Sequence, residues 1–107
     1  MSRISTRAEH YTTISVFTTT VENRQKLLEL LIEGEEELRG FHGLVSANLH
    51  LSEDGTRIIG YSQWEDSAAF DRMRAKPDRA GHFAQVRALV TKVELLACRV
   101  AYTSDGD

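Results

Sequence analysis

Trp64, the only tryptophan of the chain, is the first candidate for a residue that binds a ligand. It ends an alternating run in which Ile58, Gly60, Ser62 and Trp64 share one face of a predicted strand. A tryptophan there can form the wall of a pocket for a planar aromatic ligand, with its indole N–H free to donate to a ligand carbonyl. Gly60 and Ser62 would then contact the same ligand. The alternative is a large core residue that packs a strand against a helix.

His50 is the candidate for handling protons. It lies near the end of the preceding apolar run, two residues after Asn48 and therefore on the same face of a strand over 44–51. A histidine takes up a proton near neutral pH, so it could act as a base or as a hydrogen-bond partner of an enolate. The alternative is that His50 is simply exposed to solvent beside the hairpin turn.

These residues belong to a predicted β-hairpin over 44–51 and 56–64, because the step Asp54-Gly55 supplies the backbone conformation of a tight turn. Alternation also predicts strands over 11–18 and 92–102. Helical spacing and capping residues predict three helices: one with Thr19 as N-cap that ends near Leu38, a short one after Asp66, and one from Pro77 or Asp78.

The order β-α-β-β-α-β predicts an α+β fold, a ferredoxin-like sandwich over 11–103, with a flexible arm over 1–10 and a tail over 104–107. Its helices would cover one face of the antiparallel sheet. The strand over 56–64 carries large residues on its other face too, Ile59 and Tyr61 among them. We therefore expect a homodimer in which two sheets stack face to face as a dimeric α+β barrel.

Charge and hydropathy argue against several partners. The 107 residues carry a net charge of −3 without a basic cluster, which argues against nucleic acid. No apolar run approaches the roughly 18 residues of a membrane span. The first ten residues lack the apolar segment of a secretory signal, which predicts a cytoplasmic protein. The acidic run 33–37 is interpreted as a solvated face. Arg79 and Arg87 could pair with a phenolate, but they are interpreted as surface groups.

Three motifs give the chain a family resemblance: GLVSANLH at 43–50, the turn Asp54-Gly55-Thr56, and YSQWE at 61–65 followed by Ala69-Phe70. Over residues 11–102 they resemble the antibiotic biosynthesis monooxygenase family of dimeric α+β barrels, and most of all the small monooxygenases of aromatic polyketide pathways. The resemblance implies that O2 oxidises a polycyclic phenol or anthrone to a quinone without flavin, metal or other cofactor.

The same resemblance implies which residues line the pocket. The polyketide enzymes have a histidine matching His50, an asparagine where this chain has Gly60, and a pocket tyrosine where it has Phe70. Phe70 would keep the flat apolar shape of the pocket, and Asn48 could supply a replacement amide. Two hydrogen-bonding groups are nevertheless lost.

His82, followed by Phe83, resembles the helix histidine that ligates iron in the haem-degrading branch of this fold. Both residues are expected to line the pocket even without haem, and no metal site is predicted. Three functions therefore remain: a cofactor-free oxygenase of a planar aromatic substrate, a haem-binding or haem-degrading protein, and a non-catalytic dimeric accessory module in a biosynthetic pathway.

Overall fold

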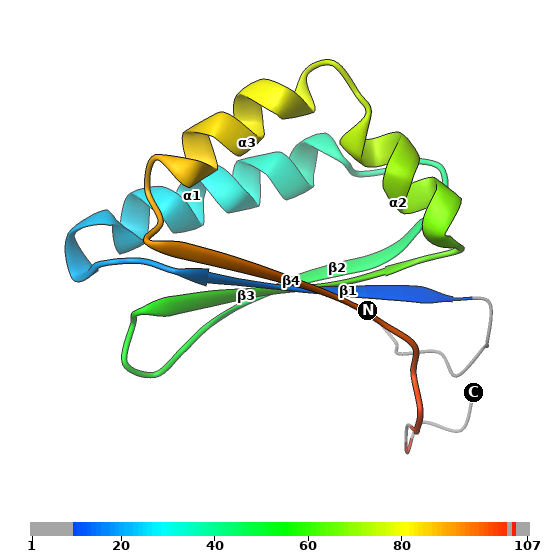
Figure 1. The fold of residues 1–107 in the computed structure, drawn as a ribbon, viewed down its shortest axis with the longest axis horizontal. Coiled ribbons are helices and arrows are strands. Elements are labelled where there is room, and N and C mark those ends of the chain that lie inside the picture. Colours follow the sequence, from blue (N-terminus) through cyan, green and yellow to red (C-terminus); the bar gives the residue numbers. More distant parts are fainter. Residues whose placement is uncertain (1–9, 103, 105–107) are drawn as a thin grey trace.

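The computed structural model describes residues 10–102 and 104, in which an antiparallel sheet carries three helices on one face (Figure 1). The predicted arm and tail lie outside these residues, apart from residues 10 and 104. The elements follow the predicted order, and the second helical segment is divided in two as predicted: β1 (Tyr11–Thr18), α1 (Val21–Glu37), β2 (Leu44–Leu51), β3 (Arg57–Trp64), α2 (Ser67–Arg74), α3 (Arg79–Arg87) and β4 (Lys92–Cys98).

The sheet has the strand order β2-β3-β1-β4, and every neighbouring pair is antiparallel. This is the predicted ferredoxin-like α+β arrangement, with β1 and β3 in the centre. β4 is an edge strand, and its Val93 and Leu95 remain 44% and 47% exposed although they face the helices. The helical side of the sheet is therefore least covered along β4.

Asp54 organises the hairpin turn between β2 and β3. Its Oδ1 accepts hydrogen bonds from Ser52 Oγ at 2.8 Å, Thr56 N at 3.0 Å and Thr56 Oγ1 at 2.7 Å. These bonds hold the pKa of Asp54 at about 2, below its ordinary value. Gly55 takes φ 73°, which a residue with a side chain rarely adopts. The second strand begins at Arg57 and not at Thr56, because Thr56 is bound into the turn.

A β-bulge near the start of β2 decides which of its side chains face the helices. Leu44 pairs with Trp64, but Ser46 pairs with Gln63, so β2 contains one extra, unpaired residue relative to β3. Beyond the bulge, the residues of β2 that an unbroken pairing would place on the face of Trp64 lie instead on the face of Tyr61 and Ile59.

Besides the start of β3, two predicted element ends are wrong. The N-cap of α1 is Thr20, whose side chain accepts from Asn23 N, whereas the hydroxyl of the buried Thr19 donates to Leu89 O at 2.6 Å. β4 ends at Cys98 instead of residue 102. The predicted N-cap Asp66 is confirmed, since its Oδ1 accepts from Ala69 N at 2.9 Å.

Two hydrophobic clusters join the helices to the sheet. One lies under α2 around Trp64, and the other lies under α1 and α3 around Leu27 and Ile58. Both gather side chains far apart in the chain, so their burial fixes how the helices sit over the sheet. None of the helices in the described part of the chain is long and apolar enough to cross a membrane.

Candidate functional site

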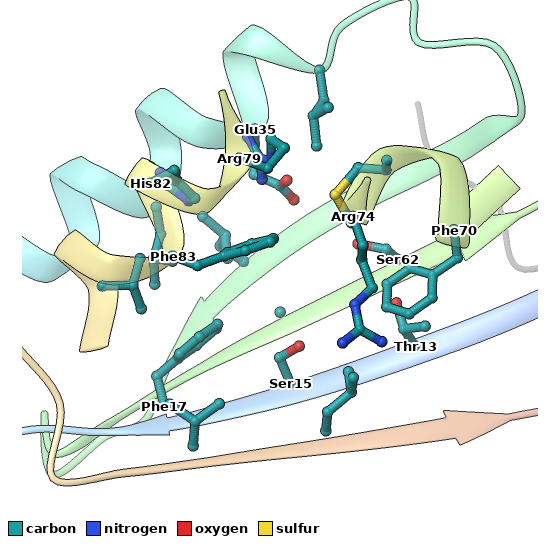
Figure 2. A pocket seen from close by; sticks show the side chains of 18 of the residues that line it. Thr13, Ser15, Phe17, Glu35, Ser62, Phe70, Arg74, Arg79, His82 and Phe83 are labelled. Carbon is teal, nitrogen blue, oxygen red and sulfur yellow. The ribbon is translucent and has the colours of Figure 1, made fainter. Parts of the chain in front are cut away.

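A cavity of about 330 Å³ separates the two hydrophobic clusters, between the helices and the helical face of the sheet (Figure 2). Its volume lies at the lower end of the range for small-molecule sites. Val93 and Leu95 of the edge strand line it and are half exposed, so the cavity opens toward solvent beside β4.

Aromatic rings form the walls of this cavity. Phe17 comes from β1, Trp64 from β3, Phe70 from α2 and Phe83 from α3. The rings of Trp64 and Phe70 meet at an angle of 63° with their centroids 5.5 Å apart. Flat, rigid walls of this kind favour a planar apolar ligand.

Trp64 serves both the cavity wall and the core. It is only 2% exposed, and its Nε1 donates to Thr13 Oγ1 at 3.2 Å. The prediction that the indole N–H is free is therefore wrong, because this donor already has a partner on the neighbouring strand β1. Trp64 offers a ligand its ring and no free hydrogen bond.

The floor of the cavity is small and polar. Ser15 of β1 and Ser62 of β3 line it, and within the described residues neither hydroxyl has a hydrogen-bond partner. Gly60 lies opposite Ser15, and a Cβ built on Gly60 would have ordinary contacts of 3.7 to 3.8 Å. The floor thus offers two hydroxyl groups and room above Gly60.

Arg79, predicted to be a surface group, is buried at the junction of α1 and α3 and only 4% exposed. Its Nη1 donates to Gly34 O at 3.3 Å and lies 3.9 Å from Glu37 Oε1, near the carboxyl end of α1 where a positive charge is favoured. Its guanidinium lies 5.3 Å from the centroid of the Phe83 ring. Arg79 holds the two helices together above the cavity.

Glu35 and His82 bring titratable groups into the same region (Figure 2). Burial raises the pKa of Glu35 above its usual range, and the charge of Arg79 partly opposes this shift. Burial also lowers the pKa of His82, and Arg79 lowers it further, against the weaker effects of Glu37 and Glu33. A neutral imidazole and a carboxylate of increased basicity therefore face the cavity together at neutral pH.

Arg74 is the last residue of α2, and its side chain extends from that helix toward the sheet (Figure 2). Its Cζ lies 5.5 Å from the centroid of the Phe70 ring. Among the described residues it has no hydrogen bond and no ion pair. Arg87 of α3 also lines the cavity. The cavity thus contains three arginines and one carboxylate, although the whole chain is acidic.

The structure brings six of the eight predicted site residues together around this cavity: Gly60, Ser62, Trp64, Phe70, His82 and Phe83. It does not bring His50 and Asn48 there. His50 pairs with Ile59 and Asn48 with Tyr61, so the bulge turns both to the opposite face of the sheet. The Asn48 amide donates to Tyr61 O at 3.4 Å, and His50 is exposed. The expectation that these two residues act beside Trp64 in one pocket is corrected.

Two charged groups of the cavity, Glu35 and Arg74, were not predicted from the sequence. The acidic run was interpreted as a solvated face, but Glu35 follows Leu31 by four residues and precedes Leu38 by three, on the buried stripe of α1. That spacing was a usable signal. Arg74 likewise lies one turn after Phe70 on α2.

The chain belongs to the antibiotic biosynthesis monooxygenase family, whose model matches residues 10–88. Tetracenomycin-F1 monooxygenase of Streptomyces glaucescens is 34% identical over 104 residues, which cover 96% of this chain and 92% of that protein. The predicted family and the assignment as a monooxygenase are thereby confirmed.

Solved structures share the fold at lower identity. SnoaB, a cofactor-independent oxygenase from Streptomyces nogalater, superposes with a TM-score of 0.83 at 21% identity over 92% of this chain and 99% of that chain. A monooxygenase from the gene ActVA-Orf6 of Streptomyces coelicolor, in complex with nanaomycin D, gives 0.76 at 22% identity over 90% and 91%. At these identities the likeness establishes the fold alone.

Proposed function

We propose that this protein is a cofactor-independent monooxygenase that oxidises a planar polycyclic phenol or anthrone of polyketide type to a quinone. The cavity carries the proposal, because flat aromatic walls enclose a small polar floor and a charged roof. The 34% identical relative, named as a monooxygenase of tetracenomycin F1, supports the substrate class. The description of SnoaB as cofactor-independent supports a reaction without a cofactor.

The proposed reaction balances with O2 alone. An anthrone loses a proton from its central CH2 group, and the resulting carbanion gives electrons to O2 and bonds to it as a peroxide. Loss of the second proton from that carbon and cleavage of the O–O bond leave a carbonyl on the ring and release water. The protein then needs to bind the flat substrate, accept the first proton and exclude bulk water.

Glu35 is our proposed proton acceptor. Its carboxylate faces the cavity, and burial raises its pKa, so it binds a proton more strongly than a surface carboxylate does. Replacing it should lower kcat by about 100-fold or more, since a general base contributes about 100- to 10,000-fold. Glu36 provides the matched control, because it is exposed and pairs with Arg39 at 3.4 Å on the outside of α1. Equal rates for Glu35→Gln and Glu36→Gln would refute this role.

The test of the function itself is O2 consumption by chelator-treated protein with a hydroxylated anthrone. Gly60→Ala should retain activity because its Cβ fits the floor, whereas Gly60→Leu should abolish it by filling the cavity. With isotopically labelled O2, one labelled oxygen should appear in the quinone. Wild-type rates equal to the uncatalysed background would refute the proposal.

The homodimer remains a proposal that rests on the opposite face of the sheet. No helix of the described residues covers this face, which carries Ile14, Ile59, Tyr61 and the 54% exposed Leu96. Burial of such a face against a second copy would remove its apolar area from water. Light scattering of the wild type should give twice the mass of one chain, and light scattering of Leu96→Glu should give the mass of a single chain. A monomeric wild type would contradict the dimer.

The haem-binding alternative has one observation in its favour and one against it. His82 lines the cavity, but its ring packs so closely on α1 that a Cβ on Gly34 would clash with Cε1 and lie 2.6 Å from Nε2. A Soret band on titration with haemin would favour this alternative. The accessory-module alternative predicts binding of the aromatic ligand without O2 consumption.

The cytoplasmic location of the protein stays a prediction.

A further inference from the structure

We infer that the cavity binds its aromatic ligand as an anion, a phenolate or enolate, with the ionised oxygen held between the Arg74 guanidinium and the hydroxyl of Ser15. The inference rests on the proposed function and adds to it the ionisation state of the substrate and the residue that stabilises its charge. Arg74 then touches the substrate and is a catalytic residue for its oxidation.

The first support is the unpaired charge of Arg74. Within the described range its only partner is the Phe70 ring, whose centroid lies 5.5 Å from Cζ. An arginine on a helix surface usually points its guanidinium into solvent. Arg74 is likewise an exposed residue, but its guanidinium points toward the sheet, on the side of the cavity where Ser15 and Phe70 lie (Figure 2). Its N–H groups are free to bind an oxygen anion.

The other titratable groups of the cavity leave Arg74 as the best-placed cation. Arg79 already donates to Gly34 O, and it lies near Glu35 and Glu37 above the ring of Phe83. His82 is neutral at neutral pH. Glu35 carries the one negative charge among the lining residues. Arg87 also lines the cavity, but among the described residues its guanidinium does not lie over an aromatic ring.

The position of Arg74 also suits the shape of the ligand. A planar molecule between the aromatic walls would contact the Phe70 ring, and its edge would then reach the guanidinium and the unpaired hydroxyl on the floor. A positive charge at that edge favours loss of the phenolic proton, since an opposite charge nearby lowers a pKa by about 1 to 3 units. The ionised form is also the one that gives electrons to O2 most readily.

A monohydroxyanthraquinone tests this inference, because it is already a quinone and its phenol and phenolate absorb at different visible wavelengths. The phenolic pKa is measured free and bound to excess wild-type protein. We expect binding to lower it by at least about one unit. Arg74→Gln should remove most of the shift, and Arg74→Lys should keep part of it.

Arg72→Gln is the matched control, because Arg72 lies on the same helix but donates to His42 O away from the cavity. It should leave the shift unchanged. An equal shift in wild type and Arg74→Gln would overturn the inference, and so would loss of the shift in Arg87→Gln alone. Anthrone-dependent O2 consumption by wild type without any shift would leave the proposed function standing and refute only this inference. Absence of both dye binding and O2 consumption would refute the two together.

Discussion

Gly34 is the position where one methyl group tests the packing of the site most directly. It lies in the last turns of α1, with the ring of His82 against it. A Cβ on residue 34 would clash with His82 Cε1 and lie 2.6 Å from Nε2, closer than real Cβ contacts allow. Gly34→Ala therefore forces the imidazole to move.

Two opposing effects set the magnitude. An alanine in a helix is favoured over glycine by about 1 kcal/mol. Overpacking a filled site costs about 1 to 3 kcal/mol. Gly34→Ala in the wild type should thus lower the free energy of unfolding by about 0 to 2 kcal/mol. In the His82→Ala background the clash is gone, and the same change should stabilise by about 1 kcal/mol.

Urea unfolding of the four proteins gives the coupling free energy, which should be about 1 to 3 kcal/mol. All four should be measured at one protein concentration, because an oligomer would make stability depend on it. An equal stabilisation by Gly34→Ala in both backgrounds would refute the reasoning, since it would mean that the imidazole does not occupy the space beside Gly34.

Three further predictions concern the frame around the cavity. Trp64→Ala should cost about 3 to 5 kcal/mol, whereas Trp64→Phe should cost only about 1 to 3, by leaving Thr13 without its donor; similar losses in urea unfolding would contradict this. Asp54→Ala should destabilise the protein above pH 3.8, and the difference in stability from wild type should vanish as the pH falls to about 2. A pH-independent difference would mean that the ionised carboxylate does not stabilise the turn. Glu35→Gln should gain stability relative to wild type as the pH rises above 4.5, because the folded state then has to bury a charge. A constant difference would show that Glu35 is not buried.

The hairpin could be predicted almost completely because its signals are local. Alternation gives the face of Trp64, and the Asp54-Gly55 step gives the turn. Both bounds of β2 are as predicted, and β3 differs by one residue. The faces of β3 then follow from the two-residue period, so Gly60 and Ser62 could be assigned to the cavity from sequence.

The error on His50 and Asn48 has a definite physical cause. Leu44 pairs with Trp64, and an unbroken register from there would put His50 opposite Ile58, on the helical face. The bulge shifts the pairing by one residue, so that His50 faces Ile59 instead. No motif of the sequence marks the bulge, because the residues around it are ordinary strand formers.

The charged roof was missed for a different reason. The arginines Arg74 and Arg79 lie at the end of α2 and the start of α3, where a surface position is the usual expectation. Their placement depends on how the two short helices pack over the sheet, which local spacing does not encode. Glu35 carried the clearer signal, through its place on the Leu31–Leu38 stripe of α1, and Arg74 carried a weaker one in its spacing from Phe70.

The misplaced strand residues and the missed helix residues together show that the sheet and the helices contribute different groups to the cavity. The bulge leaves the cavity floor with hydroxyl groups and glycine, without an ionisable side chain, so every titratable lining group comes from a helix. The sheet therefore supplies the uncharged floor and two of the four aromatic walls, whereas α1, α2 and α3 supply the other two walls and all the charged groups. Substitutions at positions 35, 74 and 82 can change the reaction without disturbing a strand pair. Relatives with this sheet are accordingly expected to bind flat molecules in common and to differ in the chemistry that follows.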